Sequence, residues 1–292
     1  MLVLESLISP QRAEKKPWNL FFLGMVYATL GVFLSLWVFE EQATIVMILL
    51  TVIAAVPLMY NTLRYEEKKD LVIDDEKTLL GEHSKALAAF MFLFFGMVVA
   101  FSLLYLILPV DTVTNLFSSQ SHTISEINAK VVTGGDVISG SAYSEGLLLR
   151  IFSNNVKVML FCVFFSFFYG AGAIFILAWN ASVIAAAVGN FVRTHLSSYA
   201  AQFGMVSFAN YLQIYGIGLA RYFIHGIPEV LSYFVGGLAG GLIGVAVIRH
   251  DFSSKSFGRV MRDAIDLLLI GVALLVVAAM VEVYITPKII SF

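Results

Sequence analysis

A histidine and two glutamates are the residues of this chain whose types could do chemistry together. His225 and Glu229 are four residues apart, and Glu282 lies near the end of the last apolar run. One imidazole and two carboxylates form a donor set that binds zinc in hydrolases. Pro228 argues against such a site, because the residue before a proline is disfavoured in the helical region, so His225 and Glu229 would not share a helical face. We therefore predict no metal site.

The same stretch, HGIPE, is interpreted as a tight turn between two membrane helices. Pro228 suits a helix start, where its missing N–H costs nothing, and Glu229 in the first turn is favoured by the helix dipole. His225 and Gly226 would form the reversal. This interpretation places the turn on the outer side of the membrane.

Several polar residues are expected at one depth, just below the outer interface. Ionisable groups inside membrane helices are costly and usually point into the bundle. We therefore predict a hydrogen-bonded cluster that joins three helices and could line an outward-facing pocket. In the alternative interpretation, each side chain reaches separately to the interface. The residues of the predicted cluster are Asn154, Asn155, Arg221, His225, Glu229 and Glu282.

The composition is that of a membrane protein. Of the 292 residues 59% are hydrophobic and only 13% are charged, and the mean hydropathy is +0.88; an ordinary soluble domain is far less apolar. A net charge of -2 excludes the basic face that nucleic-acid binding needs. The single cysteine, Cys162, excludes a disulfide framework within one chain.

Seven apolar windows predict an all-α, polytopic transmembrane bundle, since a helix needs about 20 apolar residues to cross the hydrocarbon core. The shorter apolar stretch at 181–192 predicts a re-entrant or interfacial helix on the inner face after the fourth span; the alternative is that the fourth helix simply runs on into the cytoplasm. The predicted spans are Trp18–Phe39, Ala43–Tyr60, Leu87–Leu108, Val158–Trp179, Met205–Ile224, Ile227–Ile248 and Leu267–Ile285.

Lysines and arginines predict the orientation. With the N-terminus in the cytoplasm, 13 of the 18 basic residues lie on inner segments, including 61–86 and 180–204, and 5 lie outside. We thus expect a cell-membrane protein with a retained N-terminal signal anchor, a cytoplasmic N-terminus and an outer C-terminus. The glycosylation sequon at Asn180 would be on the inner side and unused. Residues 109–156 form the predicted outer loop, with a Ser/Gly-rich, mobile centre.

Glycines in the sixth window predict close helix packing. Four-residue spacing places small residues on one face, where a neighbouring helix can approach to backbone contact. The sixth helix is therefore expected to be central, and glycine faces also allow a homodimer. The glycines concerned are Gly236, Gly237, Gly240, Gly241 and Gly244.

Five motifs in order resemble one known family. They are the Asn154-Asn155 pair, the run YGAGAIFILAWN that ends at Asn180, the HGIPE stretch, the glycine-rich helix and the final VEVYITP. Together they resemble the Stage II sporulation protein M family of polytopic membrane proteins, over roughly residues 80–292. Residues 1–79, a transmembrane hairpin with a charged cytoplasmic segment, look like an N-terminal addition to that five-span core.

The resemblance implies an architecture more than an activity. In spore-forming bacteria the named member acts as a membrane component beside cell-wall hydrolytic proteins during engulfment, and relatives occur in organisms that do not sporulate. The family's HG..E and terminal E...TP positions correspond here to His225, Gly226, Glu229, Glu282, Thr286 and Pro287.

Three functions are compatible with these features. The first is a non-catalytic membrane scaffold that recruits or localises other membrane or envelope proteins. The alternative is a transporter, channel or lipid-moving protein that uses the polar pocket. An intramembrane hydrolase is least favoured, because the sequence has neither H-E-x-x-H nor G-x-S-x-G. We predict no catalytic residue and no cofactor, and the lipid bilayer as the surrounding partner.

Overall fold

The computed structural model describes residues 9–73, 75–133, 140–166, 171–204, 207–249 and 254–286. These ranges are almost entirely helical and contain no strand, so the predicted all-α class is confirmed. Pro287 of the terminal motif, the beginning of the Ser/Gly-rich stretch at 134–139 and the first residue of the predicted Met205–Ile224 span lie outside the described residues.

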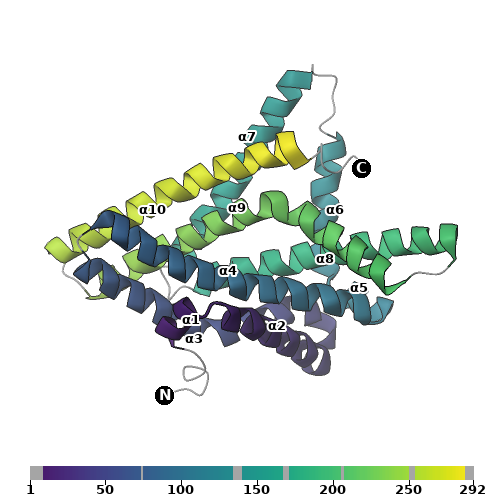
Figure 1. Cartoon of the computed structure of the whole chain (residues 1–292), viewed down its shortest axis with the longest axis horizontal. Coiled ribbons are helices and arrows are strands. Elements are labelled where there is room, and N and C mark those ends of the chain that lie inside the picture. The colour runs from purple at the N-terminus through teal and green to yellow at the C-terminus, as the bar shows by residue number, and fades with distance from the viewer. Residues whose placement is uncertain are drawn as a thin grey trace.

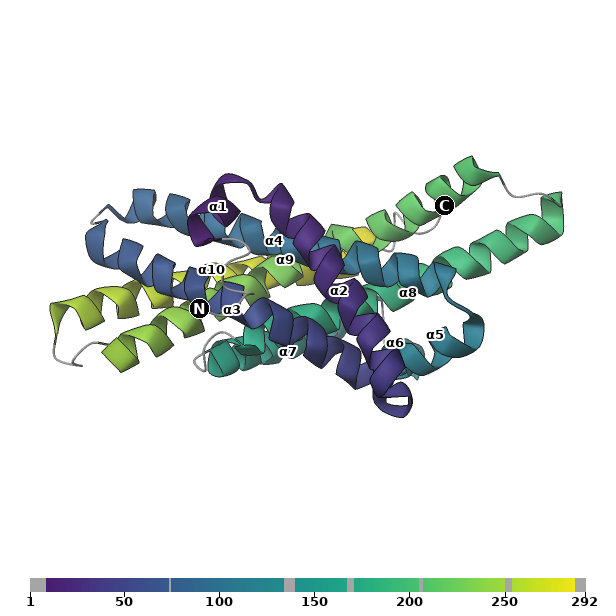
Figure 2. The same ribbon diagram turned by 90° about the horizontal axis from the view of Figure 1, so that it is seen from below.

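Seven helices are long and apolar enough to cross a membrane, as predicted. They are α2, α3, α4, α7, α8, α9 and α10, and Figures 1 and 2 show them as one elongated bundle. In chain order the elements are α1 (Pro10–Lys15), α2 (Trp18–Val38), η2 (Glu40–Gln42), α3 (Ala43–Val72), α4 (Glu76–Ile107), α5 (Val110–Leu116), α6 (Ser118–Thr133), α7 (Gly140–Ser166), α8 (Ala171–Phe203), α9 (Phe208–Arg249), α10 (Lys255–Met280) and the π-helical η3 (Val281–Ile285).

Side-chain caps fix two of the helix starts. The Asp75 carboxylate accepts a hydrogen bond from the Thr78 N–H at 2.9 Å before α4. The Ser254 hydroxyl accepts one from the Phe257 N–H at 3.1 Å before α10. Both caps satisfy N–H groups that the first helical turn leaves without partners.

Two predicted span boundaries are wrong, although the number of spans is right. The window Val158–Trp179 is divided between α7 and α8, because the chain leaves α7 at Ser166 and starts α8 at Ala171. The windows on either side of HGIPE are one helix, α9. Dividing the window Val158–Trp179 adds one span, and joining the two windows around HGIPE removes one, so the total stays at seven.

The HGIPE stretch is therefore not a turn, and Pro228 is not a helix start. Pro228 lies inside α9, where it removes one backbone hydrogen bond. Membrane helices tolerate such a proline because neighbouring groups compensate for the lost bond. Gly226 is buried within the same helix, with Ile184 of α8 3.8 Å from where a β-carbon would lie.

The predicted re-entrant or interfacial helix at 181–192 is also wrong. The alternative is right that the helix is continuous, but this helix starts at Ala171 and the stretch packs against other helices. This stretch is apolar because it packs inside the bundle, with Ala185, Ala186, Val188 and Val192 all buried. Composition alone cannot distinguish such an internal face from a segment lying in the interface.

Arg193 lies at the opposite end of the molecule from the one predicted. Its guanidinium donates hydrogen bonds to the carbonyls of Tyr105 (2.6 Å) and Leu108 (2.9 Å) at the end of α4. Asn115 of α5 donates to the Glu40 carbonyl at 2.7 Å, so the α2–α3 connection lies at this end too. When Arg193 is counted with the outer residues, 12 of the basic residues are inner and 6 are outer. The orientation stays a prediction, and the excess of inner basic residues still favours it.

The predicted outer loop is largely helical and partly packed into the bundle. Leu116 and Phe117 are fully buried. Gln120 of α6 accepts a hydrogen bond from the Thr44 hydroxyl at 3.0 Å and donates one to the Ser182 hydroxyl at 3.1 Å, linking α3 to α8. The first part of this segment is thus a fixed component of the fold.

Glycines allow the closest helix contacts. A β-carbon at Gly24 of α2 would lie 2.1 Å from the Leu93 carbonyl oxygen of α4, and one at Gly96 would lie 1.9 Å from that of Phe21. On α9, Gly236 and Gly240 face α7, Gly237 faces Ala173 of α8, Gly241 faces Leu63 of α3, and Gly244 is buried. These contacts place α9 at the centre of the bundle.

We predict that Gly240→Ala destabilises the protein, because the new methyl group would lie 2.2 Å from the Val163 carbonyl oxygen. Overpacking of this kind costs about 1–3 kcal/mol. Gly216→Ala in the same helix is the matched control, since nothing lies within 4 Å of its β-carbon position. Thermal unfolding in detergent measures both, and equal midpoints for the two variants would contradict the packing.

Candidate functional site

The structure brings part of the predicted polar cluster together where α9 passes the end of α10. The Tyr233 hydroxyl donates a hydrogen bond to Glu229 Oε1 at 2.7 Å. The Thr286 hydroxyl lies 3.4 Å from His225 Nδ1. Glu282 of η3 lies within electrostatic range of both Glu229 and Tyr233.

Arg221 and Asn154, which were predicted for the cluster, do not join this group, and neither does Asn180 of the inner-side motif. The Arg221 guanidinium lies over the Phe191 ring of α8, 5.5 Å from its centre. Asn154 is exposed, and the Asn180 amide donates to the Ile176 carbonyl of its own helix at 2.8 Å. Asn155 is buried, with 5% of its surface exposed, and its Nδ2 has no hydrogen-bond partner.

The cluster lies deeper than predicted. Glu229 follows Arg221 by eight residues in one continuous helix, which corresponds to about 12 Å. Arg221 contacts Phe191 of α8, two residues before Arg193, which binds the C-terminal end of α4. The carboxylate therefore lies well inside that level, because α9 does not turn at HGIPE.

Both helices that carry the acids are irregular at this level. Pro228 interrupts the hydrogen bonding of α9 beside Glu229, and the end of α10 is the π-helix η3, which contains Glu282. The Thr286 hydroxyl closes this segment by donating to the Val281 carbonyl at 3.2 Å. Single π-helical turns inside membrane or soluble helices occur frequently at functional sites.

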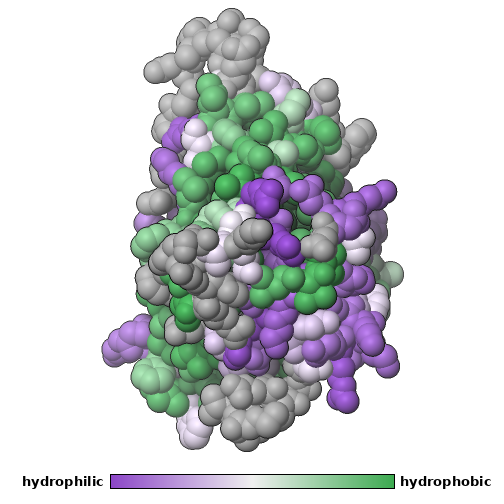
Figure 3. All heavy atoms as spheres, turned by 90° about the vertical axis from the view of Figure 1, so that its left-hand side faces the viewer, coloured by the Kyte–Doolittle hydropathy of each residue, from purple (hydrophilic) through white to green (hydrophobic). Residues whose placement is uncertain are grey.

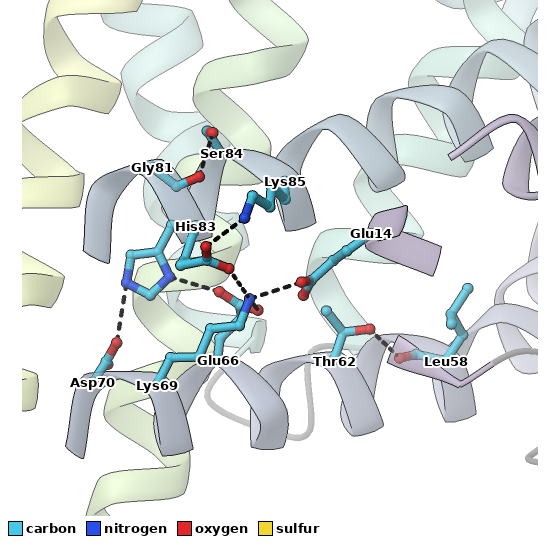
Figure 4. A network of polar contacts seen from close by, with 11 residues as sticks. Glu14, Leu58, Thr62, Glu66, Lys69, Asp70, Gly81, His83, Ser84 and Lys85 are labelled. Carbon is cyan, nitrogen blue, oxygen red and sulfur yellow. Dashed lines mark hydrogen bonds and ion pairs between the residues drawn. The ribbon is translucent and has the colours of Figure 1, made fainter. Parts of the chain in front are cut away.

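A second polar site, the ion network, was not predicted. Lys69 of α3 is 8% exposed, and its ammonium group lies 2.8 Å from Glu14 Oε2, 2.9 Å from Glu66 Oε1 and 3.3 Å from Glu82 Oε2. Figure 4 shows these side chains converging from α1, α3 and α4. Lys69 thus joins the N-terminal helix to the α3–α4 hairpin.

His83 continues the ion network. Its Nδ1 lies 2.8 Å from Glu66 Oε2 and its Nε2 lies 3.1 Å from Asp70 Oδ1 (Figure 4). His83 is 2% exposed, and Glu66 and Asp70 are fully buried. The buried part of the ion network, at Glu66, Asp70 and His83, is fixed in geometry, since each of these groups would be left uncompensated if a partner moved.

Glu14 has an unusual protonation equilibrium. Its burial and its hydrogen bond with Glu66 raise the pKa of this carboxyl from 4.5 to about 7, against the opposing effect of Lys69. Many hydrophilic residues gather on this end of the molecule (Figure 3). In the described part of the chain, no group of three or more His, Cys, Asp and Glu residues has an arrangement that could hold a metal ion.

Sequence reasoning missed the ion network because residues 61–86 contain charges of both signs, a pattern typical of a solvated helix. One signal was present: Glu66, Lys69 and Asp70 have the spacing of a single helical face, which could face a neighbouring helix. Only the packing of α4 and α1 against α3 shows that this face is buried.

The sequence profile of the Stage II sporulation protein M family matches residues 86–287, which is more than half of the chain. The chain belongs to this family. The predicted resemblance is thereby confirmed, and with seven apolar helices the chain is a multi-pass membrane protein. Neither the curated proteins nor the solved structures contain a match.

The two sites differ in their relation to the Stage II sporulation protein M region. Glu229, Tyr233 and Glu282 lie inside the matched residues, whereas Glu14, Lys69 and His83 precede them. The cluster therefore lies in the part of the chain that matches the family, and the ion network joins α1 and α3 to the beginning of α4, just before the matched residues.

We predict that Lys69→Ala destabilises the protein by about 3–5 kcal/mol, because it leaves buried carboxylates without their cation. Lys85→Ala is the matched control: Lys85 pairs with Glu82 but its side chain is 53% exposed, so its loss should cost at most about 1 kcal/mol. Denaturant unfolding in detergent measures both. Similar losses for the two variants would rule out a special role of Lys69.

Proposed function

We propose that this protein is a non-catalytic membrane scaffold that recruits or localises other membrane or envelope proteins. The observation that carries the proposal is a projecting helical hairpin, which we call the arm. The arm consists of residues 194–204 of α8 and 207–214 of α9. Figures 1 and 2 both show it extending beyond the other helices, away from the ends that meet in the ion network.

Large apolar side chains are exposed near the tip of the arm. Phe203 is 61% exposed, Phe208 is 77% exposed and Leu212 is 58% exposed. The sequence contains no Asp, Glu, Lys or Arg between Arg193 and Arg221. Large apolar groups gathered on one projecting element are typical of surfaces that bind other proteins or membranes.

The length of the helices favours a protein partner. α9 has 42 residues, or about 63 Å, against a hydrocarbon core of about 30 Å. Tyr215 is held to Ser102 of α4 at 2.6 Å, so the base of the arm is fixed to the bundle. A rigid base and an apolar tip suit a docking element better than a moving gate.

The non-catalytic part of the proposal is supported by the chemistry of the buried groups. The Tyr233 hydroxyl donates a hydrogen bond to Glu229, but Tyr233 is only 1% exposed, so a substrate could not reach this pair. The sulfur of Cys162 is buried, which disfavours the reactive thiolate. The ion network holds its basic and acidic groups against one another.

The test replaces the arm's aromatic tip. We expect Phe203→Ser with Phe208→Ser to abolish stoichiometric co-purification of a membrane or envelope protein from native membranes while the thermal stability of the chain is unchanged. Phe22→Ser is the matched control, since Phe22 of α2 is 62% exposed but lies away from the arm. Retention of the same partner by the tip variant, or loss in the control as well, would contradict the proposal.

A second function, transport, is favoured by the cluster at Glu229 and Glu282. Paired acids beside a proline and a π-helix, inside a membrane bundle, resemble the polar sites of transporters. Flux across liposomes that contain the purified protein, lost in Glu229→Gln but retained in the arm variant, would favour transport over the scaffold.

A further inference from the structure

The contact of Thr286 with His225, at 3.4 Å, lies four residues from Glu282 on η3 and four residues from Glu229 on α9, so it brings the two acids into the same part of the bundle. None of the ion pairs in the described ranges includes either residue. On α9, Arg221 is stacked over Phe191 and His225 is directed to Thr286. On α7, the nearest basic residues along the chain, Arg150 and Lys157, are exposed.

The remaining titratable groups that face the two acids cannot supply a positive charge. Tyr233 donates its hydroxyl hydrogen to Glu229. Cys162 of α7 faces Tyr233 and is fully buried. Both are neutral in their protonated forms. Among the described residues, the two carboxylates therefore have hydrogen-bond donors nearby but no counter-charge.

A buried amide on α7 supplies an independent observation. Asn155 has an unpartnered Nδ2 and is 5% exposed. Met159 and Val163, one and two turns further along the same face, contact the β-carbon positions of Gly236 and Gly240. This register, continued by one turn, places Asn155 opposite residue 232 of α9, between Glu229 and Tyr233. The unpartnered side-chain N–H donor of Asn155 therefore lies at the level of Glu229.

Two carboxylates that interact in an apolar bundle cannot both be ionised, since each charge disfavours the other and the surroundings disfavour both. One proton shared by the pair resolves this conflict, and it belongs to the pair and not to one residue. The donors Tyr233 and Asn155 can then stabilise the single negative charge that remains.

We propose that Glu229 and Glu282 form a proton-binding site inside the membrane, which holds one proton between the two carboxyl groups at neutral pH and has Tyr233 and Asn155 as hydrogen-bond donors. The site binds the proton by forming one carboxyl O–H bond and releases it by breaking that bond, with no other reactant. This inference does not depend on the scaffold proposal, because it concerns α7, α9 and α10 and not the arm.

The test is infrared difference spectroscopy of the purified protein in lipid. Subtracting the spectrum of the Glu229→Gln, Glu282→Gln double variant from that of the unmodified chain isolates these two residues from the other acids. We expect the carbonyl band of a protonated carboxyl group at neutral pH, lost only at alkaline pH. Each single variant should lose its band at lower pH than the unmodified chain, because the remaining acid no longer has a charged neighbour.

Matched controls keep the test decisive. Glu40→Gln with Glu41→Gln removes two exposed acids and should give no such band in its difference spectrum. Asn155→Ala should raise the pH at which the band disappears by about one unit, through loss of a hydrogen bond to the charged form. Asn154→Ala, which changes the exposed neighbour, should leave that pH unchanged.

The absence of the band from the unmodified chain at neutral pH would overturn the proposal. So would equal midpoints in the single variants and the unmodified chain. If the double variant does not fold, as judged by its elution from a sizing column, the two single-variant difference spectra decide in the same way.

Discussion

The close approach of α9 to α7, α8 and α3 is the constraint on which the rest of this structure depends. At Gly240 the backbone of α9 lies so near the Val163 carbonyl that no side chain fits between them. Lipid gives helices no hydrophobic reason to associate, so dispersion contacts at such short distances must hold the bundle together. The same approach fixes the register that brings Asn155 of α7 to the level of Glu229.

The bundle has two polar layers with different designs. In the ion network, Lys69 and His83 are surrounded by carboxylates, and three helices are held in one arrangement. In the cluster at Glu229 and Glu282, the acids have hydrogen-bond donors but no cation among the residues that the structure describes. The first arrangement is suited to fixing the N-terminal segment, whereas the second leaves a proton-binding equilibrium open.

The cluster and the arm both lie in the part of the chain that matches the family. The profile of the Stage II sporulation protein M family covers α7 to α10 and therefore the cluster and the arm together. Part of the arm and Glu229 both belong to α9, whereas Glu282 lies on η3, whose neighbour Thr286 contacts His225 of α9.

The sequence by itself determined the class, the number of spans and the family, because hydrophobic length and motif order are properties of the chain. It also identified Glu229, Glu282 and Asn155 as polar residues that a membrane must accommodate. Only the tertiary structure decided that HGIPE continues a helix and that residues 181–192 are buried, because a proline at a helix start and one inside a membrane helix have the same local sequence. The ion network likewise required the packing of α1, α3 and α4, since charges on a helix become buried only when other helices cover them.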